Sequence, residues 1–329
     1  MLRRWRWRRF FWPAQMGRLS NMADITGIGA SVFDTLYRLQ SMPLEDTKQK
    51  AVSVTESGGG PCGTGLVAAA KLGASTAYIG FCSDDRAGAF LRADFHKYGV
   101  DTTHMTSIPD TTAFVSCIWL ADENASRTCV FHRGTVPATQ IDESAAAAIR
   151  DSQILMVDGN DLDAAVEGAK IARTAGTSVL YDAGGQYPHV ERLLELTDIL
   201  IPSEEFALGH THADSVEHAA EKLWKMYSPK VVVITQGKQG GILYDGDRML
   251  AYPAFPVEAV DTNGSGDVFH GAFAFALTQG WGYEQCCLFA SATSAIKCLR
   301  VGAREGVPTY EAVIAFLKER GAGETYMWD

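Results

Sequence analysis

Short apolar runs recur through the second half of the chain, and segments with helical spacing separate them. The runs lie at residues 154–157, 178–181, 199–201 and 231–235, and the helical segments lie near 162–175, 189–197 and 214–227. Strands that alternate with helices form a parallel sheet with helices on both faces. We therefore predict an α/β fold whose ligands bind at the carboxyl ends of the strands.

The first half of the chain is less regular. Residues 25–30 are typical of a strand that opens into a glycine turn, and residues 66–73 of an alanine-rich helix with a glycine C-cap. Residues 31–55 alternate in patches without a helical period, and extended segments follow at 113–120 and 127–132. These segments predict a small lid of strands, from about 31–57 and 107–133, inserted into the parallel-sheet core.

Composition indicates one large globular domain at residues 22–329, because 47% of the 329 residues are hydrophobic and can form a single core. Residues 1–21 differ, with six arginines, three tryptophans and no acid, which indicates a disordered leader or an artefact of the assigned start. The remaining 23 basic residues face 39 acidic ones, so we expect no nucleic-acid partner.

Two further expectations concern location. The longest apolar stretch of the leader, Phe10-Phe11-Trp12, is too short for a signal peptide or a membrane span, so we expect no membrane partner. The chain has seven cysteines, an odd number, without CxxC spacing. Reduced thiols and a cytoplasmic location are therefore expected.

The clearest chemical signal is Asp261-Thr262-Asn263-Gly264-Ser265-Gly266-Asp267, followed by an apolar helical pattern. Two glycines one residue apart let successive backbone N–H groups converge on one point, and the start of a helix adds its positive dipole end. Asp267 faces the anion that such a loop holds, and it can accept a proton from a hydroxyl group. An ordinary glycine turn capped by aspartate is the alternative. No Gly-x-x-x-x-Gly-Lys-Ser/Thr P-loop occurs.

This segment and the Val268-Phe269 that follows resemble the second signature of the ribokinase-like (PfkB) carbohydrate kinases. The resemblance implies a parallel sheet sandwiched by helices with a small β-strand lid, whose strands pair between the subunits of a homodimer. It also implies ATP and Mg²⁺ as cofactors. The resemblance further implies that Asp267 is the general base and that the amides of Gly264, Ser265 and Gly266 stabilise the phosphoryl group.

The acceptor side carries a second resemblance. The run Gly58-Gly59-Gly60-Pro61-Cys62-Gly63 resembles the first signature of the family, in which Gly59 and Gly60 let the sugar approach the backbone. Asp34 matches the aspartate that holds sugar hydroxyls. Gly63 replaces the usual asparagine, so we expect free space beside it. Lys48 falls where the sulfofructose kinase branch has a substrate lysine, although that branch's sulfonate residues have no match around Phe131 and Gly159.

The nucleotide side follows from the same resemblance. Thr235, Gly237 and Gly240 match a phosphate-binding turn, and small residues that include Ser291 and Ser294 match the adenine-pocket helix, although core packing explains them equally well. Glu204 falls near the usual magnesium position, with a solvated helix start as the alternative. Asp261, Thr262 and Gly302 match the residues that enclose a monovalent cation such as K⁺.

The reading that unites these features is ATP-dependent phosphorylation of a primary hydroxyl of a sugar or sugar derivative. Two alternatives stay open, a nucleoside kinase of the same family and a catalytically idle sugar-binding sensor. An oxidoreductase is disfavoured, because no Gly-x-Gly-x-x-Gly follows the first strand.

Overall fold

The computed structural model describes residues 23–124 and 126–322, so the predicted leader at 1–21 lies outside the described residues. Its central sheet contains β1 Ile25–Ile28, β4 Thr76–Tyr78, β6 Val100–Asp101, β10 Ile154–Val157, β11 Ser178–Ala183, β12 Ile199–Pro202, β13 Val231–Thr235, β14 Gly241–Tyr244 and β15 Met249–Tyr252. The order is β15-β14-β13-β12-β11-β10-β1-β4-β6. Every neighbouring pair from β6 to β13 is parallel, and β14 and β15 add an antiparallel edge.

Helices cover both faces of this sheet, and the predicted strands at 154–157, 178–181, 199–201 and 231–235 are confirmed. One face carries α1 Pro61–Leu72, α2 Arg86–Lys97, α8 Ser265–Thr278, α9 Tyr283–Lys297 and α10 Tyr310–Glu319. The other carries α3 Glu143–Asp151, α4 Leu162–Ala175, α5 Glu191–Leu194, α6 Glu204–Thr211 and α7 Val216–Tyr227. Among the described residues, no helix combines the length and apolar character needed to cross a bilayer.

The two faces of the sheet belong to different hydrophobic clusters because successive strand residues point to opposite sides. Leu180 packs with α1, α8 and α9, whereas its neighbours Val179 and Tyr181 pack with α4 to α7. A strand buried on both faces is apolar at every position, which explains the uninterrupted apolar runs in the sequence.

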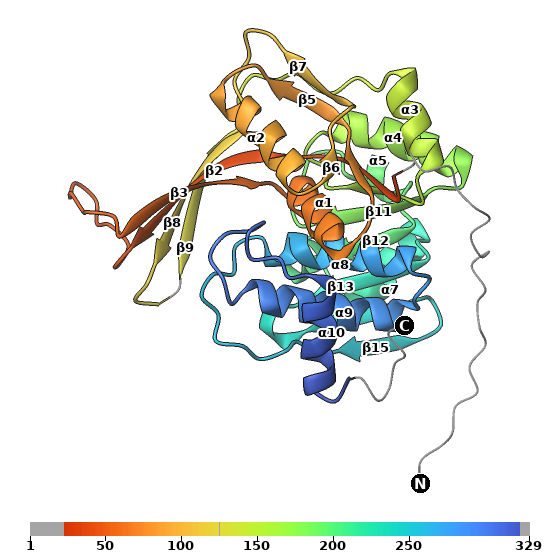
Figure 1. Cartoon of the computed structure of the whole chain (residues 1–329). Helices are drawn as coiled ribbons and strands as arrows, with labels where there is room; N and C mark the ends of the chain where they lie inside the picture. Colours follow the sequence, from red (N-terminus) through yellow and green to blue (C-terminus); the bar gives the residue numbers. More distant parts are fainter. Residues whose placement is uncertain (1–22, 125, 323–329) are drawn as a thin grey trace.

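A separate four-stranded sheet projects from the body as an arm (Figure 1). It consists of β2 Val32–Leu39, β3 Ser53–Gly59, β8 Val115–Ala121 and β9 Arg127–His132, in the order β3-β2-β8-β9. Residues 105–114 do not belong to it. β7 Met105–Ile108 pairs with β5 Gly80–Ser83 instead, because the buried side chain of Met105 packs into the body core.

Candidate active site

The predicted anion-binding loop, residues 261–267, lies at the start of α8, which packs between α1 and α9. Gly264 is the N-cap residue with φ 73°, and a Cβ there would lie 2.6 Å from Cβ of Ala303. Glycine is therefore needed for both conformation and space. The amide of Ser265 donates to the Thr262 carbonyl at 3.2 Å. Within the described chain, the amides of Gly264 and Gly266 donate to no protein acceptor. The amide of Asp267 has no acceptor among the described residues either, so this helix start carries three free donors.

Gly266 lies within the first turn of α8 and borders open space, since a Cβ there would meet no atom within 4 Å. Its φ is not in the left-handed region. A larger side chain at residue 266 would therefore enter open space without straining the turn.

Asp267 follows at the same helix start and is partly exposed. The surrounding protein removes its carboxyl from water, which raises the pKa above the usual range. The nearby carboxylate of Asp182 adds to the increase. Asp182 lies at the end of β11, so the carboxyl ends of the strands and the start of α8 meet here. A carboxyl with a raised pKa next to free amides suits proton transfer from a hydroxyl group.

His270, which the sequence analysis did not single out, anchors this helix start to the sheet. Its buried ring places Nδ1 2.6 Å from the Gly266 carbonyl oxygen and Nε2 2.9 Å from the Ile201 carbonyl oxygen. Nδ1 also lies 3.2 Å from a carboxylate oxygen of Asp182. Burial lowers the pKa of His270, and the two hydrogen bonds offset part of that decrease. The ring therefore holds Gly266 in register with β12.

Asp158 is a second residue that the sequence analysis missed. Its buried carboxylate accepts hydrogen bonds from the backbone amides of Ala30 at 2.8 Å, Cys62 at 3.0 Å and Asn160 at 2.8 Å. It thereby joins the turn after β1, the first turn of α1 and the end of β10. The available signal was its place directly after a buried strand, at the edge where ligands bind.

Asp34 lies on β2 with its side chain buried, and Ser116 on β8 donates a hydrogen bond of 2.6 Å to it. Burial raises the pKa of Asp34 to about 6, while the Ser116 bond and the Arg304 charge counteract this increase. A Cβ at Gly59 would collide with the Asp34 carboxylate, so glycine at residue 59 is a condition for this placement. The charge of Asp267 also raises the pKa of Asp34, so the predicted acceptor residue and the predicted base interact electrostatically.

Gly63 has a different neighbour from the one expected, because the space beside it is filled by Arg304. This fully buried guanidinium donates to the Asp94 carboxylate at 2.7 Å and to the Gly59 carbonyl at 2.7 Å. A side chain at residue 63 would collide with Nη2 of Arg304. The expectation of free space beside Gly63 was therefore wrong. Nothing near residue 63 in the sequence signals this arginine from the far end of the chain.

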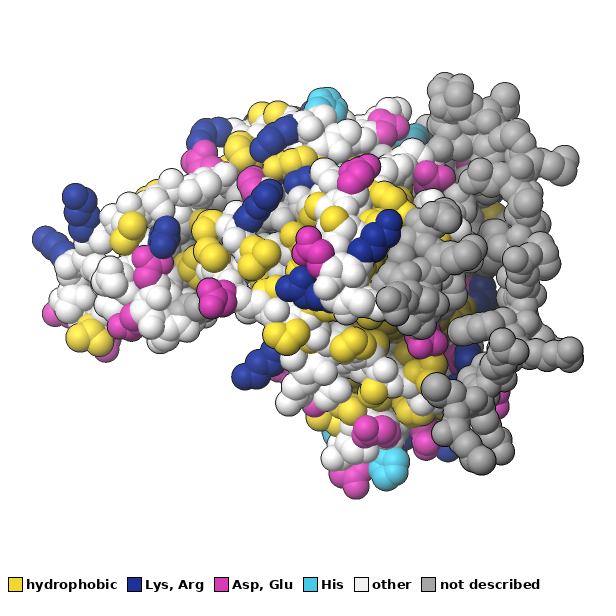
Figure 2. All heavy atoms as spheres, turned by 60° about the horizontal axis from the view of Figure 1, so that its bottom comes forward, with side chains coloured by type: hydrophobic (Ala, Val, Ile, Leu, Met, Phe, Trp, Pro, Cys, Tyr) yellow, Lys and Arg dark blue, Asp and Glu magenta, His cyan; other side chains and the backbone are white. Residues whose placement is uncertain are grey.

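Lys48 does not lie near Asp34 of the same chain. It is exposed in the loop between β2 and β3, beyond the pair Arg38–Ser53, whereas Asp34 pairs with Ser57 near the body. Figure 2 shows basic side chains at the far end of the projecting arm. At about 3.3 Å per strand residue, the end of β2 lies more than about 15 Å along the arm from Asp34.

The predicted nucleotide turn follows β13. Thr235 ends that strand and forms a parallel bridge with Ser203, the N-cap of α6. Gly237 and Gly240 have φ 55° and 86°, which glycine adopts readily. Gln236 donates to Glu204 at 3.0 Å. The turn and Glu204 are therefore neighbours at the carboxyl ends of β12 and β13.

Ser291 and Ser294 lie on α9, where their hydroxyl groups already have partners. Ser291 donates to the Pro253 carbonyl at 2.7 Å, and Ser294 donates to the Ser265 carbonyl at 2.8 Å. Both bonds fix α9 against neighbouring segments, and the second braces the anion-binding loop. Each hydroxyl therefore has a structural role in addition to any contact with a nucleotide.

The predicted cation residues Asp261, Thr262 and Gly302 come together beside α9. Asp261 is buried and accepts from the amides of Asn263 at 2.8 Å and Gly302 at 2.9 Å. The ammonium of Lys297 lies 2.8 Å from the Asp261 carbonyl oxygen. The arm reaches the same loop, since Arg127 on β9 donates to the Thr262 hydroxyl at 2.9 Å. No cluster of three or more His, Cys, Asp or Glu side chains suited to a metal occurs in the described part of the chain.

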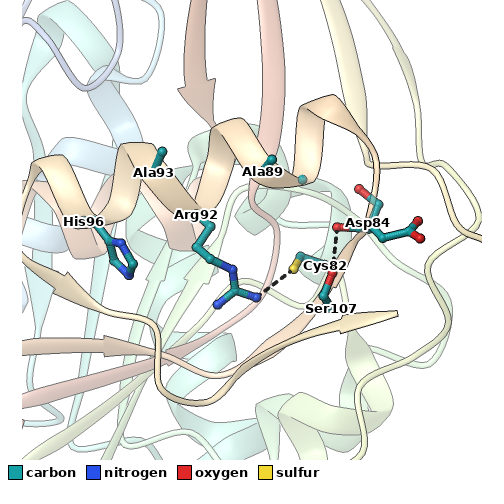
Figure 3. Close-up of a pocket in the computed structure, with 9 residues that line it drawn as sticks. Cys82, Asp84, Ala89, Arg92, Ala93, His96 and Ser107 are labelled. Carbon is teal, nitrogen blue, oxygen red and sulfur yellow. Dashed lines mark hydrogen bonds between the residues drawn. The ribbon is translucent and has the colours of Figure 1, made fainter. Parts of the chain in front are cut away.

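A hollow of about 320 Å³ lies apart from these residues, between α2 and the β5–β7 pair (Figure 3). Arg92 points across it from α2, with its guanidinium 3.3 Å from the sulfur of Cys82 and 2.5 Å from the Met105 carbonyl oxygen. These contacts tie α2 to the two strands. None of the predicted site residues lines this hollow.

Comparison with known proteins identifies the class. Residues 22–310 match the pfkB family carbohydrate kinase domain. The chain is 28% identical over 269 residues to ribokinase of Haemophilus influenzae, covering 79% of this chain and 87% of that protein. It is 26% identical over 318 residues to a nucleoside kinase of Methanothermobacter thermautotrophicus, covering 92% and 98%. The crystal structure of ribokinase from Thermotoga maritima aligns with TM-score 0.78 at 25% identity, covering 90% of this chain and 100% of that one.

The fold and the site thus define an ATP-dependent phosphotransferase with a sugar or nucleoside as acceptor. The chain belongs to the pfkB family of carbohydrate kinases. The predicted ribokinase-like fold and kinase activity are confirmed.

Proposed function

We propose that the protein transfers the γ-phosphoryl group of ATP to a primary hydroxyl of a sugar or sugar derivative, with Asp267 as the general base. The observation that supports this assignment most is the position of Asp267 in the first turn of α8, beside the free amides of Gly264 and Gly266. Its raised pKa makes it a stronger base than an ordinary aspartate.

In the proposed mechanism, Asp34 and the backbone at Gly59 and Gly60 hold the acceptor, and Asp267 takes the proton of its attacking hydroxyl. The amides of Gly264 and Gly266 donate to the phosphoryl oxygens as negative charge develops there. Arg127 adds positive charge beside the same loop. Bound Mg²⁺ would neutralise phosphate charge, and Glu204, beside the nucleotide turn, is the residue proposed to orient it.

The experiment that tests this proposal is ADP release with ATP and a panel of pentoses, hexoses, ketoses, acidic sugars and nucleosides. Release that depends on a sugar supports the proposal, and release only with nucleosides supports the nucleoside kinase. Binding of a sugar without any ADP release would support the idle sensor.

The acceptor we favour is a sugar with an acidic substituent. A second hollow, of about 450 Å³, begins at Gly29, Ala30 and Ser31, the turn before the strand that carries Asp34. Arg133 lines it, and its guanidinium donates to the carbonyl and side-chain oxygens of Asn160 at 3.2 and 3.1 Å. Its two hydrogen bonds use neutral oxygens, so its positive charge is available to an anionic group even though the carboxylates of Asp161 and Asp163 line the same hollow.

We also propose a homodimer through the projecting arm. Val54 and Val130 are 53% and 61% exposed, and they occupy the same face of the arm because each pairs with a residue of the central strands on that face. Phe131 on the opposite face is 60% exposed. Such apolar exposure on strands is typical of an interface between chains, and the family resemblance supports a second copy as the partner.

Two further assignments stay predictions. A cytoplasmic location rests on the odd number of cysteines and the absence of CxxC spacing. A monovalent cation such as K⁺ at Asp261, Thr262 and Gly302 rests on the family resemblance alone, and the buried ammonium of Lys297, 2.8 Å from the Asp261 carbonyl oxygen, argues against it.

A further inference from the structure

Lys297, the last residue of α9, is a fully buried lysine beside the anion-binding loop. Lysine is rarely buried completely, because the removal of an ammonium from water is costly unless oxygen atoms replace the water. A lysine at this place therefore needs a specific explanation. Neither the predicted general base nor the arm explains why this lysine is buried, because neither is a hydrogen-bond partner of its ammonium.

The partner of Lys297 is Asp261, through both backbone and side chain. Its Nζ lies 2.8 Å from the Asp261 carbonyl oxygen and 3.7 Å from Oδ2 of the same residue. Both side chains of this ion pair are 0% exposed. Burial lowers the pKa of Lys297, whereas the charges of Asp261 and Asp267 raise it. The ammonium and the carboxylate thus compensate each other inside the protein.

Asp261 in turn controls the geometry of the loop. Its carboxylate accepts from the amide of Asn263 on one oxygen and from that of Gly302 on the other. The turn that contains Gly302 therefore closes onto the segment that precedes Gly264. A positive charge beside the carboxylate of Asp261 stabilises this closure. The closure in turn fixes the direction in which the free amides point.

The chain provides room for the lysine stem. A Cβ at Gly306 would lie 2.9 Å from the Lys297 carbonyl oxygen and 3.3 Å from its Cγ. The glycine of this turn lets the lysine side chain pass beneath it toward Asp261. The complete burial of Lys297, its ion pair and the room for its aliphatic chain point to one function of this side chain.

We propose that the ammonium of Lys297 takes the place of the monovalent cation, as an internal positive charge that braces the anion-binding loop. An ammonium carries the same charge as K⁺, and that of Lys297 already lies against the carbonyl and carboxylate oxygens of Asp261. The residues at Asp261, Thr262 and Gly302 therefore do not fit a separate ion while Lys297 occupies this place. The inference concerns loop stability and goes beyond phosphoryl transfer, so it stands or fails independently of the acceptor.

Thermal unfolding tests it without any assay of catalysis. The wild-type protein is melted at constant ionic strength in K⁺, Na⁺ and tetramethylammonium salts, and its Tm is expected to be the same in all three. Lys297→Ala leaves a cavity and an uncompensated Asp261, so its Tm in tetramethylammonium is expected to fall by about 5 °C or more. K⁺ is expected to restore about half of that loss by binding in the vacated space.

Two variants serve as controls. Lys297→Met fills the space with an apolar group, so it loses stability without a K⁺ response. Lys222 also donates to backbone carbonyls, those of Thr211 and His212, but lies on α7. Lys222→Met is therefore expected to show no K⁺ response.

Anomalous diffraction from wild-type crystals soaked in Tl⁺ gives a direct answer even where the variants do not fold. No Tl⁺ peak is expected between Asp261 and the Gly302 turn of the wild type, and a peak there is expected in Lys297→Ala. A Tl⁺ peak beside Asp261 in the wild type, or a wild-type Tm that rises with K⁺, would overturn the proposal.

Discussion

Gly63 and the guanidinium of Arg304 occupy adjoining space, such that any side chain at residue 63 would collide with Nη2 of the arginine. The same guanidinium holds the Gly59 carbonyl and pairs with Asp94, so it fixes the backbone on which the acceptor is proposed to lie. The glycine in the first signature and the arginine near the end of the chain thus form one structural unit.

Gly63→Ala is the direct test of this pairing. The added methyl group has to displace a buried arginine, so we expect a loss of about 1–3 kcal/mol in the free energy of unfolding and a higher KM for the acceptor. Urea denaturation and steady-state kinetics measure the two effects. Gly282→Ala is the control, because a Cβ there meets no atom within 4 Å and the change affects only the N-cap of α9. Equal stability of the two variants would contradict the collision.

Asp267→Asn removes the proposed base and keeps its shape. We expect kcat to fall by about 10²–10⁴-fold while nucleotide affinity, measured by calorimetry, changes little. Asp214→Asn is the control, since Asp214 lies on the surface and pairs with the exposed His218. A turnover close to the wild-type value in Asp267→Asn would rule out the base assignment.

The pH dependence of acceptor binding is expected to report on Asp34. Its pKa is raised from 3.8 to about 6, so the ionised form that accepts hydroxyl hydrogen bonds is lost as the pH falls through about 6. KM for the acceptor therefore rises below that pH. Because the pKa is raised, Asp34 favours the folded state at low pH and loses that contribution as the pH rises through about 6.

Ser116→Ala shifts this profile in a defined direction. The hydroxyl of Ser116 stabilises the ionised form of Asp34, so its removal raises the pKa further and moves the increase in KM to higher pH. Initial rates from pH 5 to 8 at saturating ATP measure the shift. A shift toward lower pH would show that Asp34 does not control acceptor binding.

Arg133→Gln and Lys48→Ala separate two sources of positive charge. Arg133 lines the hollow next to the acceptor residues, whereas Lys48 lies in the exposed loop at the end of the arm. We expect Arg133→Gln to raise KM by about tenfold for an acidic sugar and little for a neutral one, as loss of a charge-assisted bond predicts. Lys48→Ala is expected to leave KM for both sugars unchanged, because within one chain Lys48 lies far from the acceptor residues. Equal losses for both sugars in Arg133→Gln would reject the charge argument.

The proposed dimer is tested on the apolar face of the arm. Val130→Glu introduces a charge on β9, so light scattering after gel filtration is expected to show a monomer for this variant and a dimer for the wild type. Met226 on α7 is 54% exposed, and Met226→Glu serves as the matched control that stays dimeric. A monomeric wild type at micromolar concentration would refute the arm interface.

Several elements were predictable because their signal is local. The strands 154–157 and 231–235 are buried on both faces, so each is apolar throughout. Gly264 is required by both conformation and space at the start of α8, so the loop before Asp267 is visible as a motif. The sheet to which the strand 105–108 belongs was less predictable. Its pairing with β5 depends on a contact with the core that no short pattern contains.

Contacts between distant segments could be known only from the folded chain. The ion pairs Arg304–Asp94 and Lys297–Asp261 join residues 210 and 36 positions apart. Each charge is buried only because its partner arrives from another element, and neither residue carries a local mark of that partner. Hydrophobic periodicity and glycine geometry are properties of short segments, and they determine the class and the catalytic loop. The compensation of buried charges is a property of the whole packed molecule, and it decides which side chains brace that loop.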